Sequence, residues 1–253
     1  MDDRLQPKVA LVTGGTTGIG LATARRLLAE GCSVMMASRN RERGENVVAD
    51  LDSARVAFHR LDVTDESSVE SSVEATVRRF GRLDYLFNNA GIEGTAGPMA
   101  AWSADVVAAV LDVNVKGAFL CMKHAAPRMV AGSVIVNGSS WLGMIPMPAA
   151  APYAASKAAL LSLTRSAAAE LAERGISVFA TCPAVVDTPM MDRISQMAGA
   201  PKSALAEGVC PSRQVTSPDR VAEVVAGLLT SETPFESGSA LRIDPNEVER
   251  VGP

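Results

Sequence analysis

Histidine is scarce in this chain: of 253 residues only two are histidine, His59 and His124. Neither belongs to a motif, which argues against a histidine-based triad and against a metal site built from several histidines. The four cysteines are widely scattered and none forms a Cys-x-x-Cys pair, so a zinc site is not expected either. Isolated cysteines in apolar stretches behave as small hydrophobic residues and fit a reducing, cytoplasmic location.

Long apolar runs and strong charge imbalance are also missing. No apolar run approaches the roughly 18 residues that a membrane span needs, and the start, Met1-Asp2-Asp3-Arg4, lacks the apolar region of a secretory signal. The 24 basic and 28 acidic residues give a net charge of −4 without a basic run, so neither a membrane nor nucleic acid is an expected partner. With no repeat, low-complexity tract or linker, residues 1–253 are expected to form one domain.

A glycine-rich turn follows the first apolar segment. Lys8 to Thr13 are typical of a buried strand in a parallel sheet, and Leu21 to Glu30 of a helix that Gly31 ends. Backbone amides at the start of such a helix face an anion, and glycines let the backbone approach it closely. The intervening sequence, Thr13-Gly14-Gly15-Thr16-Thr17-Gly18-Ile19-Gly20, therefore predicts a phosphate-binding turn of a dinucleotide site.

The second predicted strand, Ser33 to Ala37, bears on the choice of cofactor. In a dinucleotide fold, an acidic residue at the end of this strand binds the ribose 2′-hydroxyl of NAD. Here the strand runs into Ser38-Arg39-Asn40-Arg41, which contains no carboxylate. Because a guanidinium matches the geometry of phosphate, Arg39 favours NADP(H), with NAD(H) as the alternative if Arg39 is only a solvated residue at a helix start.

Strands continue to alternate with helices along the chain. Further strands are expected at residues 55–60, 83–87, 133–137, 176–182 and 239–243, and helices at 41–51, 66–80, 103–129, 153–174 and 218–230. The alternation predicts an α/β fold: a single Rossmann-type, doubly wound parallel sheet of about seven strands with helices on both faces. Ligands bind beyond the carboxyl ends of such strands. Residues 188–217 show little periodicity and are expected to form a mobile substrate lid.

Tyr153 and Lys157 are four residues apart in the alanine-rich helix, which places them on one helical face. A free tyrosine, with a pKa of about 10, is a poor acid or base at neutral pH. A neighbouring ammonium favours the phenolate and lowers that pKa. The pair is therefore expected to give a proton donor or acceptor near neutral pH.

Taken together, these features resemble the short-chain dehydrogenase/reductase family. The resemblance extends from about Pro7 to Asp244 and rests on motifs in the expected order: Thr13-Gly14-x-x-x-Gly18-Ile19-Gly20, Asp62, Asn88-Asn89-Ala90-Gly91, Asn114, Ser140 and Tyr153-x-x-x-Lys157. It implies that Tyr153 transfers the proton, that Lys157 holds the nicotinamide ribose, and that Ser140, rather than Ser139, hydrogen-bonds the substrate oxygen. It also implies that Asn114 keeps a water in a proton relay. Asn114, Ser140, Tyr153 and Lys157 are thus the expected catalytic residues.

The same resemblance implies a set of cofactor-binding residues. They are Gly14, Thr17, Gly18 and Ile19 along the pyrophosphate, Ser38 and Arg39 at the adenosine ribose, Asp62 and Val63 at the adenine, Asn89, Ala90 and Gly91 around the cofactor ribose, Tyr153 and Lys157 at the nicotinamide ribose, and Pro183, Val186 and Thr188 at the nicotinamide. No metal is implied.

The expected substrate pocket is mostly apolar. Its expected lining is Ile92, Glu93, Trp141, Leu142, Met144, Ala184, Val185 and the methionines of residues 188–217. Flexible methionines suit a bulky hydrophobic ligand, although they also suit plain packing. Glu93 is expected either to contact a polar group of the substrate or to be a solvated loop residue.

Three departures from the family pattern are present, and one of them is Phe179 in the sixth strand, in the neighbourhood of a position where the family often has asparagine. Ala184 replaces a usual glycine after Pro183, where its methyl would narrow the pocket. The usual Asp-Gly-Gly ending is Asp244-Pro245-Asn246 here, followed by a charged tail from Glu247 to Pro253. This last departure puts the usual C-terminal packing in question.

The resemblance implies an NADP(H)-dependent oxidoreductase that reduces a ketone or imine of a fairly apolar small molecule. It also implies a homo-oligomer, a dimer or a tetramer, formed through the helices that carry Asn114 and Tyr153. One alternative is an NAD-dependent alcohol dehydrogenase of the same fold. The other is a catalytically silent NADP(H) sensor, against which the intact set of four catalytic residues argues.

Overall fold

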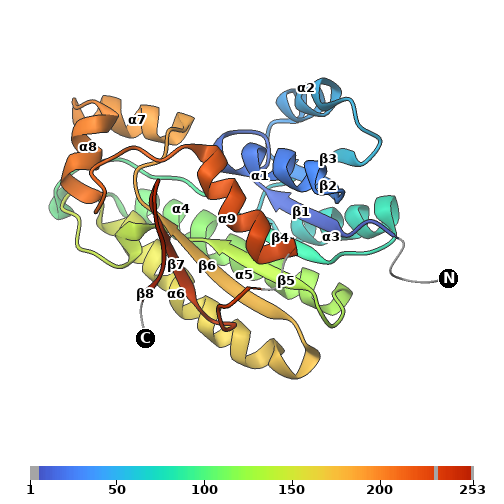
Figure 1. Ribbon diagram of the computed structural model, residues 1–253. Coiled ribbons are helices and arrows are strands. Elements are labelled where there is room, and N and C mark those ends of the chain that lie inside the picture. The colour runs from blue at the N-terminus through green and yellow to red at the C-terminus, as the bar shows by residue number, and fades with distance from the viewer. Residues whose placement is uncertain (1–5, 231–232, 252–253) are drawn as a thin grey trace.

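The computed structural model describes residues 6–230 and 233–251, which form one eight-stranded sheet flanked by helices (Figure 1). The strand order is β3-β2-β1-β4-β5-β6-β7-β8. The strands are β1 (Val9–Thr13), β2 (Ser33–Ser38), β3 (Val56–Arg60), β4 (Tyr85–Asn88), β5 (Val134–Gly138), β6 (Ser177–Pro183), β7 (Ala240–Ile243) and β8 (Val248–Val251). The first seven are parallel, so the predicted doubly wound fold is confirmed.

The eighth strand was not predicted. Residues 248–251 of the charged tail pair antiparallel with β7, with Val248 opposite Ile243 and Val251 opposite Ala240. The two valines are partly buried while the intervening Glu249 and Arg250 are exposed. Charged residues on an edge strand discourage pairing with another chain, and here the hairpin covers the edge of β7.

Helices cover both faces of the sheet. They are α1 (Gly18–Ala29), α2 (Arg41–Leu51), α3 (Glu66–Phe80), α4 (Ala104–Leu111), α5 (Gly117–Ala125), α6 (Ala151–Leu171), α7 (Pro189–Ala198), α8 (Lys202–Val209) and α9 (Pro218–Thr230). Residues of α1 and α9 share one core with alternate strand residues such as Val12 and Met36. Residues of α3, α5 and α6 share the other with Leu11 and Met35. This alternation follows from the two-residue repeat of a strand whose faces are both buried. None of the described helices is long and apolar enough to cross a membrane.

Two predicted segments differ in detail. The helix expected over residues 103–129 is divided: α4 is followed by a π-helical segment, Asp112–Lys116, then by α5 and a 3₁₀ turn at Ala126–Arg128. The segment expected to lack regular structure contains α7 and α8, which Figure 1 shows in orange outside the layers on the sheet. The Thr188 side chain caps α7 by accepting a hydrogen bond from the Met191 amide, and Gly199 ends it in the left-handed conformation.

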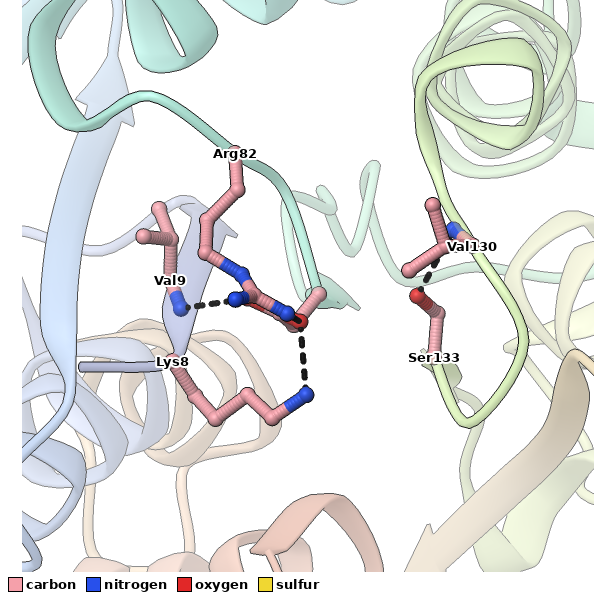
Figure 2. Close-up of polar contacts among 6 residues, drawn as sticks. Lys8, Val9, Arg82, Val130 and Ser133 are labelled. Atoms are coloured by element: carbon pink, nitrogen blue, oxygen red, sulfur yellow. Dashed lines mark hydrogen bonds and ion pairs between the residues drawn. The ribbon is translucent and has the colours of Figure 1, made fainter. Parts of the chain in front are cut away.

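A buried carboxylate joins the starts of β1 and β4, at the end of the strands opposite the predicted site. Asp84 is 1% exposed and accepts hydrogen bonds from the Val9 amide and from Lys8 Nζ at 2.9 and 3.0 Å. Arg82 donates to both of its oxygens, at 2.7 and 2.6 Å. Figure 2 shows Lys8 and Arg82 reaching toward each other from the two segments. The neighbouring turn is closed by Ser133, which accepts from the Val130 amide at 3.2 Å.

Candidate active site

A cavity of about 620 Å³ opens at the carboxyl ends of the central strands. Most of the predicted site residues line it: Gly14, Thr17, Gly18, Ile19, Asn89, Ala90, Gly91, Ser140, Tyr153, Lys157, Pro183, Val186 and Thr188. The sheet order reverses beside β1, which pairs with β2 on one side and β4 on the other. Ligand sites of open α/β sheets form at this reversal because neighbouring loops turn to opposite faces.

The glycine-rich turn is shaped to face an anion. No side chain caps the N-terminus of α1 at Thr17, so its first amides are left to the cavity. Gly14 has φ of +63°, and a Cβ there would lie 2.9 Å from Asn89 Nδ2. Asn89 Nδ2 in turn donates to the carbonyls of Thr13 and Gly14, at 3.0 and 3.2 Å. These residues fit the pyrophosphate of a dinucleotide.

Four predicted adenosine-site residues lie outside the main cavity, at the ends of β2 and β3: Ser38, Arg39, Asp62 and Val63. Arg39 is exposed, and the Ser38 hydroxyl accepts from Thr16 Oγ1 at 3.2 Å. The Asp62 carboxylate accepts from Thr64, which lowers its pKa, and the charge of Arg39 lowers that pKa further. The end of β2 thus carries a solvent-accessible guanidinium that fits a 2′-phosphate.

Tyr153, Ser140 and Lys157 meet at the cavity wall. Tyr153 and Lys157 belong to α6, and Ser140 precedes the 3₁₀ turn Trp141–Gly143 after β5. Ser139, the less favoured candidate, donates its hydroxyl to the carbonyl of Lys157 at 2.7 Å. Ser139 therefore supports α6, and Ser140 is the serine that faces the tyrosine.

The expected lowering of the Tyr153 pKa is not what this structure shows. Burial raises the pKa of Tyr153 to about 12, while the hydrogen bond with Ser140 lowers it. Lys157 Nζ lies 5.5 Å from the centre of the tyrosine ring and donates to the Gly138 carbonyl at 2.7 Å. Burial also lowers the pKa of Lys157 to about 8. Desolvation, which disfavours both charged forms, therefore outweighs the attraction between them.

Asn114 lies outside the cavity lining, one layer behind it. Its Oδ1 accepts from the Ile92 amide at 2.8 Å, and its Nδ2 donates to the Ile92 carbonyl and to Ser156 Oγ, both at 2.9 Å. A Cβ on Gly91 would lie 3.3 Å from Asn114 Oδ1 and 3.5 Å from Lys157 Nζ, so the two side chains approach the same glycine. Asn114 joins the loop after β4 to α6, and its role in a water relay remains a prediction.

Most of the residues expected to line the substrate pocket lie on the cavity wall. Glu93, Trp141, Leu142, Ala184, Val185 and the methionines Met190, Met191 and Met197 line the cavity. Ile92 and Met144 do not: Ile92 is held by Asn114, and Met144 packs against Leu161 and its neighbours. Arg193 was not predicted as a site residue; it pairs with Glu93 across 100 residues of chain. No local motif signals such a pair.

The C-terminal segment, which departs from the family pattern, packs near the cavity-wall residue Trp141. Arg242 of β7 places its guanidinium 5.5 Å from the ring centre of Trp141. Glu247 and Glu249 hold that guanidinium at 2.8 and 2.7 Å. The β7–β8 hairpin therefore packs behind a residue of the cavity wall.

Comparison with known proteins agrees with this geometry. A family model described as short chain dehydrogenase matches residues 8–199. The 2,5-dichloro-2,5-cyclohexadiene-1,4-diol dehydrogenase of Sphingobium indicum is 36% identical over 243 residues, 95% of this chain and 96% of the relative. The crystal structure of levodione reductase superposes with a TM-score of 0.88 at 33% identity, covering 95% and 97% of the two chains. The structure of ElxO with NADP bound has a TM-score of 0.88 at 31% identity, covering 95% and 98%.

Proposed function

This chain belongs to the short-chain dehydrogenase family, and we propose that it is an NADP(H)-dependent reductase of a ketone, with an imine as the second candidate group, on a fairly apolar small molecule. Oxidoreductase activity follows from the family. The observation that carries the proposal is the meeting of Tyr153, Ser140 and Lys157 in the same cavity as the uncapped start of α1.

Bound NADPH would supply the hydride that reduces the carbonyl carbon. Tyr153 is then the proton donor, because desolvation keeps its hydroxyl protonated at neutral pH. It gives its proton to the substrate oxygen as charge develops there, and Ser140 holds the tyrosine hydroxyl by a hydrogen bond. The ammonium of Lys157, fixed by the Gly138 carbonyl, stabilises the negative charge left on the tyrosine oxygen.

Arg39 is the residue on which the cofactor proposal rests. Its exposed guanidinium at the end of β2 fits a 2′-phosphate, and no acidic residue follows within Ser38-Arg39-Asn40-Arg41. A solved relative, ElxO, holds NADP. Use of NAD(H), whose reduced form is bound in a related 3-ketoacyl-(acyl-carrier-protein) reductase, is the alternative.

The substrate is proposed to be a carbocyclic ketone. Side chains of Trp141, Leu142, Val185 and Met191 give the cavity apolar walls, which suit a compact hydrophobic ligand. One relative is named for a cyclohexadiene diol and another for cis-4-hydroxycyclohexanecarboxylate.

Self-association is part of the same proposal. Leu111 and Phe119 are 39% and 50% exposed, and they line a shallow groove with Leu163 on the outer face of α4, α5 and α6. A second copy of the chain would cover these apolar side chains, giving a dimer or a tetramer.

A nicotinamide-absorbance assay tests the function. Purified protein is mixed with cyclohexanone-type ketones and imines, with NADPH and NADH in parallel. We expect NADPH to be the better reductant, and replacement of Arg39 by alanine to raise the KM for NADPH about tenfold or more while leaving that for NADH unchanged. Arg43→Ala, which removes an exposed arginine of α2, is the matched control. Preference for NADH would overturn the cofactor assignment, and binding of NADPH without turnover of any panel member would favour the sensor.

A further inference from the structure

An ion pair to which the proposed mechanism assigns no step lies on the cavity wall. Arg193 of α7 donates from Nε to Glu93 Oε1 at 2.5 Å and from Nη2 to Glu93 Oε2 at 3.0 Å. Arg193 Nη1 also donates to the Pro189 carbonyl at 3.1 Å, which orients the guanidinium along its own helix. The pair joins the loop after β4 to α7, and both residues line the cavity.

The burial of the two partners is unequal. The Glu93 side chain is 11% exposed, whereas that of Arg193 is 54% exposed. Glu93 is also near enough to the reacting group for its negative charge to act on Tyr153. The Glu93 carboxylate therefore lies on the buried part of the cavity wall, and the Arg193 guanidinium lies where the cavity opens to solvent.

The rest of the described lining is almost without charge. Apart from this pair, Lys157 is the only charged residue among the described residues that line the cavity, and the mechanism already uses it. A charge in a cavity of low polarity is costly unless an opposite charge lies beside it. The bidentate contact satisfies both members of the pair, so the wall offers a charged ligand neither a free cation nor a free anion.

We infer that the Glu93–Arg193 pair makes the cavity selective for the charge of its substrate. The cavity accepts uncharged ketones and rejects both carboxylate-bearing and ammonium-bearing ones. The inference rests on the proposed reductase function and deepens it. Removal of one partner frees the other, and the freed charge should attract a substrate of opposite sign and repel one of like sign.

Three ring ketones test this inference: cyclohexanone, 4-oxocyclohexanecarboxylate and 4-aminocyclohexanone, which is a cation at neutral pH. For the wild-type protein, kcat/KM is expected to be highest with cyclohexanone. Glu93→Gln should raise the ratio of carboxylate-ketone to amino-ketone kcat/KM about tenfold or more, and Arg193→Gln should lower it by a similar factor.

Two further variants serve as controls. One distinguishes the effect of the Arg193 charge from an effect of α7 position, and the other tests whether any change in surface charge has the same effect. Arg193→Lys keeps the positive charge without the bidentate geometry, so it should keep the wild-type order of the three ketones. Glu74→Gln removes the acidic member of a surface pair with Arg128, 3.6 Å apart, and should change nothing. Thermal unfolding confirms that each variant is folded.

The outcomes are distinct. Wild-type turnover of cyclohexanone with ratios unchanged in both Gln variants overturns this inference and leaves the proposed function standing. A shift of the ratio in the same direction in Glu93→Gln and Arg193→Gln would show a displacement of α7, not a charge effect, and would also overturn it. Absence of turnover of every ketone by the wild-type protein overturns the proposed function and the inference with it.

Discussion

Burial disfavours the charged forms of both Tyr153 and Lys157. The Tyr153 pKa is raised to about 12, and that of Lys157 is lowered to about 8. A protonated tyrosine is ready to give a proton to a carbonyl oxygen, as reduction requires.

Replacement of Tyr153 by phenylalanine removes that proton. We expect kcat for ketone reduction to fall by a factor of about 10² to 10⁴, the usual contribution of a general acid. Steady-state kinetics with NADPH measure the loss. Tyr85→Phe, a change to the buried tyrosine of β4, is the matched control and should leave kcat unaltered. A Tyr153→Phe variant with near-native turnover would contradict the assignment.

The pH dependence of reduction should report Lys157. Below about pH 8 its side chain is protonated in the free enzyme, and it loses its charge as the pH rises through that value. In the proposed mechanism the ammonium stabilises the charge left on Tyr153, so kcat/KM should decline above about pH 8. Because burial raises the pKa of Tyr153 to about 12, titration of the tyrosine cannot account for a decline that begins near pH 8. Lys157→Arg, which stays charged, should move the decline to higher pH, and a flat wild-type profile up to about pH 10 would refute the assignment.

At the scale of elements, the site depends on the close contact between α6 and the 3₁₀ turn Trp141–Gly143. A Cβ on Gly143 would lie 2.8 Å from the Lys157 carbonyl carbon and 2.9 Å from the Ala158 amide nitrogen. Both atoms are backbone and cannot move aside. The turn can therefore pack on α6 only with glycine at this position, and Ser140 precedes that turn.

Gly143→Ala should push the turn away from α6 and displace Ser140 from Tyr153. Displacements of about 1 Å at a reacting group can cost about 10²-fold in rate, so we expect kcat to fall roughly 10- to 100-fold. Gly227→Ala in α9, where a Cβ meets nothing within 4 Å, is the matched control and should keep full activity. Equal activity of the two variants would show that the contact does not position Ser140.

For the whole molecule, Asp84 links the starts of two central strands. Its carboxylate is neutralised by Lys8 and Arg82 and accepts from a strand amide. Asp84→Asn removes the buried negative charge beside Lys8 and Arg82, so the free energy of unfolding should drop by about 2–4 kcal/mol. Urea unfolding measures the change. Activity at low temperature should persist, because the cluster lies at the end of the sheet opposite the cavity; a stability change below about 0.5 kcal/mol would contradict this role.

The proposed oligomer is a second property of the whole molecule. Sedimentation should show a dimer or a tetramer. Phe119→Arg should shift the equilibrium toward the monomer, because association would then bury a charge in the proposed contact. Val130→Arg, at an exposed apolar residue before β5, is the control and should not alter the assembly. A wild-type monomer would refute the proposal.

Much of the fold and of the candidate site was determined by the sequence alone. Short apolar runs alternating with helical segments predicted the parallel sheet, because strands buried on both faces must be apolar throughout. Glycines beside β1 and the four-residue spacing of Tyr153 and Lys157 are local signals, and each predicted residues that line the cavity. The helices α7 and α8 and the strand β8 were missed, since their short amphipathic patterns become stable only through tertiary packing.

Only the tertiary structure decided how these residues act on one another. Burial, rather than the spacing of Tyr153 and Lys157, sets the direction in which their pKa values move, and burial depends on every element packed around α6. The pairing of Glu93 with Arg193 joins positions 100 residues apart, and that of Arg242 with Trp141 also joins distant segments. Such contacts follow from how the chain returns to the same edge of the sheet, which no local pattern encodes.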